Sequence, residues 1–121
     1  MDIYKCEVCG NVVEKIYDGG GVLVCCGQDM VLQEINVEET TYDKHIPVVE
    51  ETENEIKIQI GSELHPMEND HHIEWIALVT PKGIIRRKIQ VGEEPKVIFG
   101  KMTDEYAIYA YCNIHGLYKS E

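Results

Sequence analysis

Four cysteines near the start of the chain constrain its fold most strongly. Cys6 and Cys9 are two residues apart, whereas Cys25 and Cys26 are adjacent. Residues 1–37 are too few to bury much apolar surface, so a metal ion bound by the four thiolates must supply much of the stability. Four thiolates around one tetrahedral ion suit iron or zinc. The adjacent pair departs from the two-residue spacing usual in zinc ribbons.

The segment between the two cysteine pairs predicts a hairpin. Residues 12–17 and 22–24 have the composition of two short strands, and the glycine-rich residues 18–21 form the turn between them. An acidic, polar connection follows at residues 34–43. We place a domain boundary near Val37.

After this boundary the apolar residues alternate with a period of two, as in strands with one buried face. Short strands with turn signals every ~8–12 residues predict an antiparallel β-sandwich. The expected strands are residues 46–50, 55–60, 73–79, 84–91, 96–99 and 106–111. Residues 46–50 are expected at a sheet edge because Pro47 cannot donate to a ladder. The whole chain is expected to be all-β, with a small metal-stapled module at residues 1–37 and the sandwich at residues 38–121.

Charge and hydropathy exclude several classes of partner. The net charge is −11, from 22 acidic and 11 basic residues, and nucleic-acid binding needs a basic face instead. No apolar run approaches the ~20 residues of a membrane-spanning helix. Residues 1–5 lack the apolar core of a signal peptide. We therefore expect a cytoplasmic protein, where closely spaced cysteines are more often metal ligands than disulfides.

A second metal site is expected in the second domain. Cys112 and His115 are three positions apart, so their side chains can reach the same ion. His65, His71 and His72 lie between two expected strands, in a loop that can direct several imidazoles to one point. Adjacent side chains diverge in extended backbone, so only one of the pair His71 and His72 is expected to be a ligand, and we favour His71.

Lys44 and His45 follow the acidic connection. An exposed lysine is usually a solvated charge. On an acidic protein, however, a cation beside a metal marks a place that attracts a small anion. Screening over ~8 Å at physiological salt weakens the effect of distant carboxylates.

Together and in this order, these residues resemble the desulfoferrodoxin family, the two-iron superoxide reductases. The opening cysteines are similar to the family's desulforedoxin-type module. The family's catalytic signatures are matched by Lys44-His45-Ile46-Pro47, by His65-Pro66-Met67 with His71, and by Cys112-Asn113-x-His115. The resemblance covers nearly the whole chain, and it implies an immunoglobulin-like sandwich.

The resemblance implies two iron ions per chain. The first would be bound by Cys6, Cys9, Cys25 and Cys26, where zinc is the alternative metal. The second would be bound by the equatorial histidines His45, His65, His71 and His115 and by the axial Cys112. The position opposite the sulfur would be open in the ferrous state, with Lys44 beside it. Asp43 stands where many family members have a glutamate that closes this position after oxidation.

The implied activity is one-electron reduction of superoxide to hydrogen peroxide, without production of dioxygen. A rubredoxin is the electron donor that the resemblance implies, and a homodimer is the implied assembly. A blue-copper electron carrier is one alternative, although residues 116–121 lack the methionine usual after its histidine. A non-catalytic zinc-binding module is the other alternative.

Overall fold

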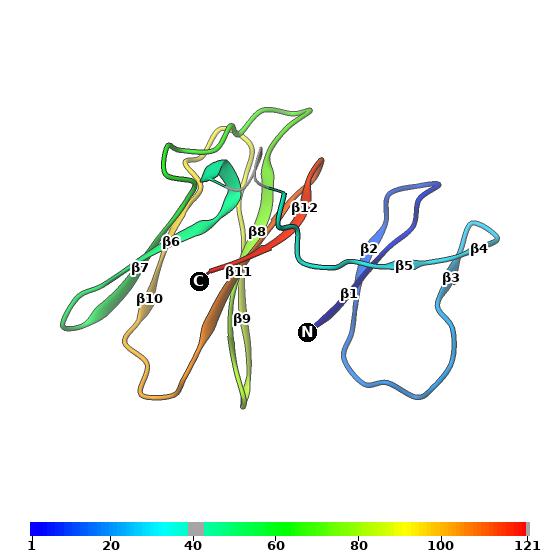
Figure 1. Cartoon of the computed structure of the whole chain (residues 1–121), viewed down its shortest axis with the longest axis horizontal. Coiled ribbons are helices and arrows are strands. Elements are labelled where there is room, and N and C mark those ends of the chain that lie inside the picture. The colour runs from blue at the N-terminus through cyan, green and yellow to red at the C-terminus, as the bar shows by residue number, and fades with distance from the viewer. Residues whose placement is uncertain (39–42, 121) are drawn as a thin grey trace. The chain divides into compact units, whose positions relative to one another are not determined.

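The computed structural model describes residues 1–38 and 43–120, which form two compact units, Met1–Glu34 and Ile35–Glu121. Both units are built from β-strands (Figure 1). Residues 39–42 of the predicted acidic connection lie outside the described part of the chain. The prediction of an all-β chain is confirmed.

The first unit contains five short strands. They are β1 (Asp2–Lys5), β2 (Val12–Lys15), β3 (Val24–Cys25), β4 (Gln28–Asp29) and β5 (Val31–Leu32). β1 lies between β2 and β5 in one sheet, and β3 pairs with β4. The predicted hairpin between residues 12–17 and 22–24 is therefore wrong. Cys26 (φ 53°) and Gly27 (φ 75°) turn the chain back sharply after β3. β3 therefore pairs with β4 and not with the strand at residues 12–17.

The first unit has very little core. Ile3 and Cys6 are buried, with exposed fractions of 2% and 1%, whereas Ile16 and Tyr17 are almost fully exposed. Each fully buried large apolar side chain stabilises a fold by about 1.5–3 kcal/mol. Burial of two side chains offsets only a small part of the conformational entropy that the unit loses on folding. Another interaction must therefore offset the rest.

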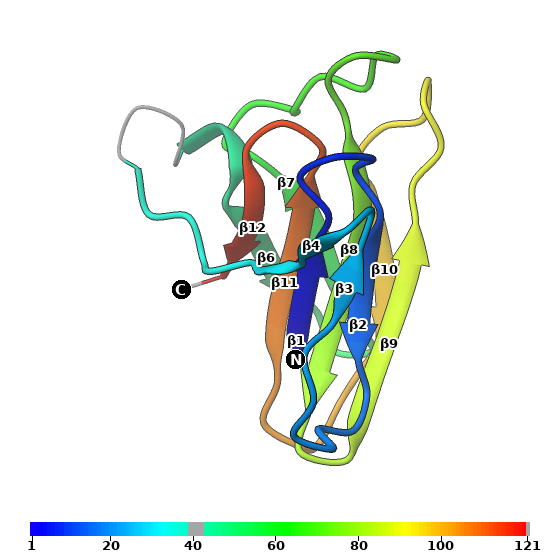
Figure 2. The same ribbon diagram turned by 90° about the vertical axis from the view of Figure 1, so that its right-hand side faces the viewer.

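The second unit is an antiparallel sandwich of two sheets. Its strands are β6 (Pro47–Glu51), β7 (Glu55–Ile60), β8 (Ile73–Thr80), β9 (Gly83–Lys88), β10 (Lys96–Gly100), β11 (Ala107–Cys112) and β12 (Gly116–Lys119). One sheet has the order β10-β7-β6 and the other β12-β11-β8-β9 (Figures 1 and 2). The predicted sandwich is confirmed, with β6 at an edge as expected.

The predicted alternation is clearest in β7. Ile56, Ile58 and Ile60 are buried in the core between the sheets, whereas Lys57 points outward. The central strand β8 contributes Ile73, Ile76 and Leu78 to the same core. This core fixes the strands whose ends carry the histidines and Cys112.

β12 was not predicted, because Gly116–Lys119 is too short to show a periodic pattern. It pairs with β11 through a tight turn, with Cys112 opposite Gly116. Gly116 adopts φ 85°, which a residue without a Cβ tolerates. This turn places Cys112 and His115 on the same short loop.

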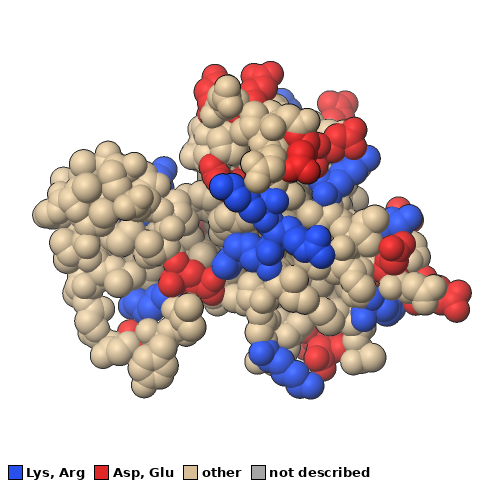
Figure 3. All heavy atoms as spheres, turned by 180° about the vertical axis from the view of Figure 1, so that it is seen from behind, with Lys and Arg blue, Asp and Glu red and all other residues tan. Residues whose placement is uncertain are grey.

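The surface charge is unevenly distributed. All six residues of β9 are exposed, including Arg86, Arg87 and Lys88. Figure 3 shows one face on which basic side chains gather in a group with acidic side chains around it. The net charge of −11 therefore does not describe every part of the surface. Within residues 1–38 and 43–120, no helix has the length and apolar character needed to cross a bilayer.

Candidate metal centres

The first unit brings its four cysteines together. The sulfur atoms of Cys6, Cys9, Cys25 and Cys26 all lie within 4.8 Å of one another. The Cys9–Cys25 and Cys25–Cys26 sulfur distances are 3.7 Å and 3.9 Å. Thiolates at ~2.3 Å from one tetrahedral ion lie ~3.8 Å apart. All four thiols are free of disulfide bonds, and their spacing fits a single ion.

Local backbone geometry explains how adjacent cysteines share this centre. The left-handed conformation of Cys26 lets its side chain turn toward the same point as that of Cys25. Backbone N–H groups also reach the sulfurs: Cys9 donates to Cys6 Sγ (3.4 Å) and Asn11 to Cys9 Sγ (3.5 Å). The Asn11 side-chain amide donates to Cys25 Sγ (3.7 Å).

The pKa values of these thiols indicate that the site needs a cation. The backbone N–H of Cys9 contributes most to lowering the pKa of Cys6, to about 6. Hydrogen bonds with Cys9 and then Cys25 raise the pKa of Cys26 to about 12. Four thiolates this close repel one another, so a metal ion is needed to hold them all deprotonated.

A second cluster lies in the sandwich. His45, His65, His71 and Cys112 have donor atoms that all lie within 4.8 Å of one another. His45 Nε2 is 2.9 Å from His65 Nε2, and Cys112 Sγ is 3.6 Å from His65 Nε2. Two nitrogens bound at ~2.1 Å to one ion, at right angles, lie ~3.0 Å apart. The spacing of His45 and His65 matches this distance.

His115 joins the same cluster through its other ring nitrogen. Its Nδ1 lies 3.1 Å from His45 Nε2 and 3.8 Å from Cys112 Sγ. The rings of His65 and His115 both approach His45 closely, with centroid distances of 4.4 Å and 4.7 Å, whereas His71 is 6.0 Å from His45. The structure therefore brings together all five side chains that the sequence singled out for the second ion.

Four separate segments supply these side chains. His45 ends a short helical segment at residues 43–45 before β6, and His65 and His71 lie in the β7–β8 loop. Cys112 ends β11, and His115 lies in the turn to β12. Each donor thus comes from the end of a strand or from a connecting loop, and the sandwich core holds these ends in place.

Neighbouring groups fix two of the imidazoles. The His65 Nδ1–H donates to the Pro66 carbonyl oxygen at 2.7 Å, which leaves Nε2 available to a metal. The ring of His45 stacks on Tyr118, with a centroid distance of 4.6 Å and an interplanar angle of 14°. Both His45 and Tyr118 are buried.

His71 provides a direct test of whether a metal fits. Its Nε2 is buried and has no hydrogen-bond partner in the described part of the chain. A buried polar atom without a partner costs about 1–3 kcal/mol, and a metal ion at the centre of the cluster would remove this cost. The residues present therefore fit an ion bound by nitrogen and sulfur.

Burial favours the uncharged forms of three of these side chains, His65, His71 and Cys112. Burial lowers the pKa of His65 to about 4 and also lowers the pKa of His71. It raises the pKa of Cys112, against the opposing effect of backbone N–H groups of His115 and Ile114. Neutral imidazoles are the form that binds metals. A cation would complete the set by displacing the proton of Cys112.

The remaining candidates lie around the cluster. Lys44 and Asp43 are exposed beside the buried His45, and their catalytic roles stay predictions. The ring of His72 is engaged elsewhere, with Nε2 2.6 Å from Glu74 Oε1 and Nδ1 donating to the Glu68 carbonyl oxygen at 2.8 Å.

Sequence reasoning missed the residues that support the ligands. Tyr118 packs on His45, and the Asn36 side-chain amide donates to the His115 carbonyl oxygen at 2.8 Å. Asn113 was noted only as part of a motif, although it bonds residues in the β7–β8 loop. These partners are distant in sequence, so no spacing could have revealed them.

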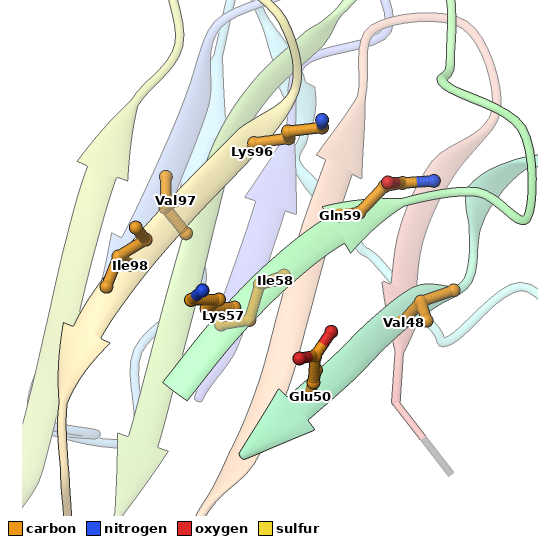
Figure 4. A pocket seen from close by; sticks show the side chains of 8 residues that line it. All are labelled: Val48, Glu50, Lys57, Ile58, Gln59, Lys96, Val97 and Ile98. Atoms are coloured by element: carbon orange, nitrogen blue, oxygen red, sulfur yellow. The ribbon is translucent and has the colours of Figure 1, made fainter. Parts of the chain in front are cut away.

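A surface hollow elsewhere on the sandwich has a different character. Figure 4 shows it on the β10-β7-β6 sheet, lined by Val48, Glu50, Lys57, Ile58, Gln59, Lys96, Val97 and Ile98. None of the clustered histidines or cysteines lines it. The donor cluster is therefore separate from this hollow.

Comparison with known proteins identifies the family. The family model described as desulfoferrodoxin, N-terminal domain, matches residues 1–33, and the desulfoferrodoxin model matches residues 37–121. The chain belongs to the desulfoferrodoxin family. A desulfoferrodoxin homolog of Archaeoglobus fulgidus is 46% identical over 120 residues, which cover 99% of this chain and 96% of that protein.

Two further relatives show how far the family similarity extends. Desulforedoxin of Megalodesulfovibrio gigas is 66% identical over 32 residues, covering 26% of this chain and 86% of that protein. The crystal structure of the superoxide reductase from Treponema pallidum superposes with a TM-score of 0.77 at 28% identity. It covers 99% of this chain and 96% of that structure, so the similarity extends over both units.

Proposed function

We propose that the protein is a superoxide reductase with two iron ions per chain. The observation that carries the proposal is the convergence of four imidazoles and one cysteine sulfur on one buried point. The structural relative from Treponema pallidum, which covers nearly the whole chain, is named a superoxide reductase. A blue-copper site needs two histidines and one cysteine, so the number of imidazoles here favours the reductase.

We assign His45, His65, His71, His115 and Cys112 as ligands of the catalytic iron, and Cys6, Cys9, Cys25 and Cys26 as ligands of the other iron. Ferrous iron held by these five residues would supply the one electron that, with two protons, converts superoxide to hydrogen peroxide. No second superoxide is oxidised, so no dioxygen is formed.

The protein groups prepare the site for an anion. The five donors carry a single negative charge once Cys112 is a thiolate, so a dication bound there keeps a net charge of roughly +1. Lys44 adds a second positive charge on the exposed segment next to His45, where it attracts superoxide and orders water for protonation. Asp43, its neighbour, stands where many family members have a glutamate that can bind the oxidised iron, and its side chain is one methylene shorter.

The two domains have different roles in this proposal. Residues 38–121 form the catalytic domain, and residues 1–37 form the Fe(Cys)4 module. The iron of this module would stabilise the module's fold and could relay electrons. A rubredoxin is the proposed electron donor, and the proposed assembly is a homodimer. The free cysteines of both centres suit a reducing compartment, so we place the protein in the cytoplasm.

Metal analysis combined with stoichiometry tests the function. The purified protein should contain two iron ions per chain, and the reduced protein should consume superoxide with formation of peroxide and no dioxygen. Cys112→Ser should remove the visible absorption of the ferric His/Cys centre and leave that of the Fe(Cys)4 centre. Dioxygen release at half the rate of superoxide loss would indicate a dismutase and contradict the proposal. Zinc at both centres of protein grown with ample iron would favour the non-catalytic module.

A further inference from the structure

Asn113 joins the two loops that carry ligands of the His/Cys cluster. Its side-chain Oδ1 accepts a hydrogen bond from the backbone N–H of His72 at 2.8 Å. Its Nδ2 donates to the Asp70 carbonyl oxygen at 3.0 Å. Its backbone N–H donates to the His72 carbonyl oxygen at 3.1 Å. Asn113 therefore bonds the residue before His71 and the residue after it.

These hydrogen bonds connect the backbone around His71 to the backbone around Cys112. Asn113 follows Cys112 in the chain, so its backbone cannot move without moving the sulfur ligand. Asp70 and His72 flank His71 in the same way. The side chain of one residue thus sets the distance between two donors that are 41 positions apart in sequence.

His71 depends on this support more than His65 and His45 do. The ring of His65 is oriented by its bond to the Pro66 carbonyl oxygen, and the ring of His45 by stacking on Tyr118. The buried Nε2 of His71 has no hydrogen-bond partner in the part of the chain that the structure describes. The position of this ring is therefore determined by the backbone of its loop, and a mutual pair of hydrogen bonds between Glu68 and His71 closes that loop locally.

We propose that Asn113 is a positioning residue that holds His71 at the catalytic iron, an inference that rests on the proposed function. Asn113 is not one of the five donors of the cluster. Its two side-chain hydrogen bonds keep His71 within reach of the ion that Cys112 binds. Without them, Asn113 keeps only its backbone bond to the His72 carbonyl oxygen, and His71 becomes a weaker ligand.

Two substitutions separate the contributions of the side-chain atoms. Asn113→Ala removes both side-chain bonds. Asn113→Asp keeps an acceptor for the His72 N–H but loses the donor to the Asp70 carbonyl oxygen. The effect should therefore be largest for alanine and intermediate for aspartate. Asn69→Ala is the matched control, because Asn69 is an exposed asparagine of the same loop.

The measurement is the rate of iron release to a chelator, followed at each centre by its own visible absorption in the full-length protein. Loss of groups that orient ligands typically weakens metal binding by about 10–100-fold. We expect Asn113→Ala to release iron from the His/Cys centre about tenfold faster or more, and to shift its absorption. The Fe(Cys)4 centre of the same molecule should release iron at the wild-type rate.

Three outcomes would overturn the positioning role. The first is wild-type iron release and an unshifted spectrum in Asn113→Ala. The second is equal acceleration at both centres, which would indicate general loss of stability. The third is an equal effect of Asn69→Ala. None of these three outcomes depends on the reduction of superoxide, so the positioning role and the proposed function can fail separately. A wild-type protein that binds iron in the cluster but does not reduce superoxide would contradict only the proposed function.

Discussion

The backbone of Gly61 lies against the backbone of the Lys44–His45 segment. It adopts φ +87°, and a Cβ built there would lie 2.3 Å from the Glu63 carbonyl oxygen and 2.6 Å from the Lys44 carbonyl oxygen. Both atoms belong to backbone, so neither can rotate away. Only glycine allows the chain that leads to His65 to pass this close to the chain that leads to His45.

Gly61→Ala should therefore displace the Lys44–His45 segment. Left-handed backbone alone costs a residue with a Cβ about 1–2 kcal/mol, and the two backbone clashes add to this. We expect a lower melting temperature and loss of iron from the His/Cys centre, measured by calorimetry and metal analysis.

Gly92→Ala is the matched control for this prediction. Gly92 adopts φ +93°, but a Cβ there would have no atom within 4 Å. This variant should show the backbone strain alone and keep its iron. Equal iron loss in the two variants would contradict the role assigned to the close approach at Gly61.

Lys44 allows a test of electrostatic attraction at the level of one charge. Lys44→Ala removes the exposed cation next to His45, so the association of superoxide with the reduced protein should slow by up to about tenfold. Its dependence on ionic strength should also weaken, because screening acts on the removed attraction. Pulse radiolysis measures both quantities.

Lys57→Ala provides the same change of net charge on the β10-β7-β6 sheet, where Lys57 lines the hollow in Figure 4. Its rate constant should remain close to that of the wild type. If both lysine variants slowed association equally, the effect would belong to net charge, and the specific role of Lys44 would be refuted.

At the scale of the strands, the sequence predicts what depends on local pattern. Ile56, Ile58 and Ile60 alternate with polar residues, so β7 and its buried face could be recognised directly. The pairing in the first unit could not, because the turn at Cys26 and Gly27 changes which strands meet. The cysteines and histidines of the metal sites could also be recognised from the sequence, because their side chains are typical metal ligands.

The contacts that support the metal ligands could not be predicted from the sequence in this way. Asn113 and Tyr118 act through hydrogen bonds and stacking with residues far away in the chain. Such contacts exist only after the sandwich has formed, and an asparagine or tyrosine alone has many other uses. Ligand identity was therefore more predictable than ligand support.

The end of β6 is joined to the segment before β11 by a side-chain hydrogen bond at the surface. The Tyr106 hydroxyl donates to Glu51 Oε1, and Lys101 Nζ lies 2.8 Å from Glu51 Oε2. Burial and then the bond to Glu51 raise the pKa of Tyr106 to about 12. Because the pKa is higher in the folded state than its value of ~10 in the unfolded chain, this stabilisation is complete below pH ~10 and is lost as the pH approaches 12.

Tyr106→Phe should therefore lower stability by about 1–2 kcal/mol at neutral pH. The difference in melting temperature between wild type and variant should shrink above pH ~10, where the wild type loses the same bond. Tyr109→Phe is the control, because the Tyr109 ring lies under Lys119 Nζ and its hydroxyl has no hydrogen-bond partner among the residues that the structure describes. A difference that stayed constant up to pH 12 would contradict the assignment.

The whole molecule combines two units that are stabilised in different ways. The second unit has a continuous apolar core that includes Ile56, Ile76, Leu78 and Ile108, all fully buried. The first unit buries little besides Ile3 and Cys6. Metal binding should therefore be a condition for folding of the first unit, whereas the sandwich should fold through burial and use its metal for chemistry.

Cys9→Ser tests this division in the full-length chain. Cys9 is exposed, so the change removes one ligand without opening a cavity, and serine is a poor ligand for a site built for thiolates. We expect loss of iron from the first centre and unfolding of residues 1–34, seen as loss of amide protection in hydrogen exchange. The sandwich should keep its protection, its iron and its reaction with superoxide, because its core and donor cluster lie within residues 35–121. Simultaneous loss of protection in both units would show that they fold as one cooperative body and would refute the division.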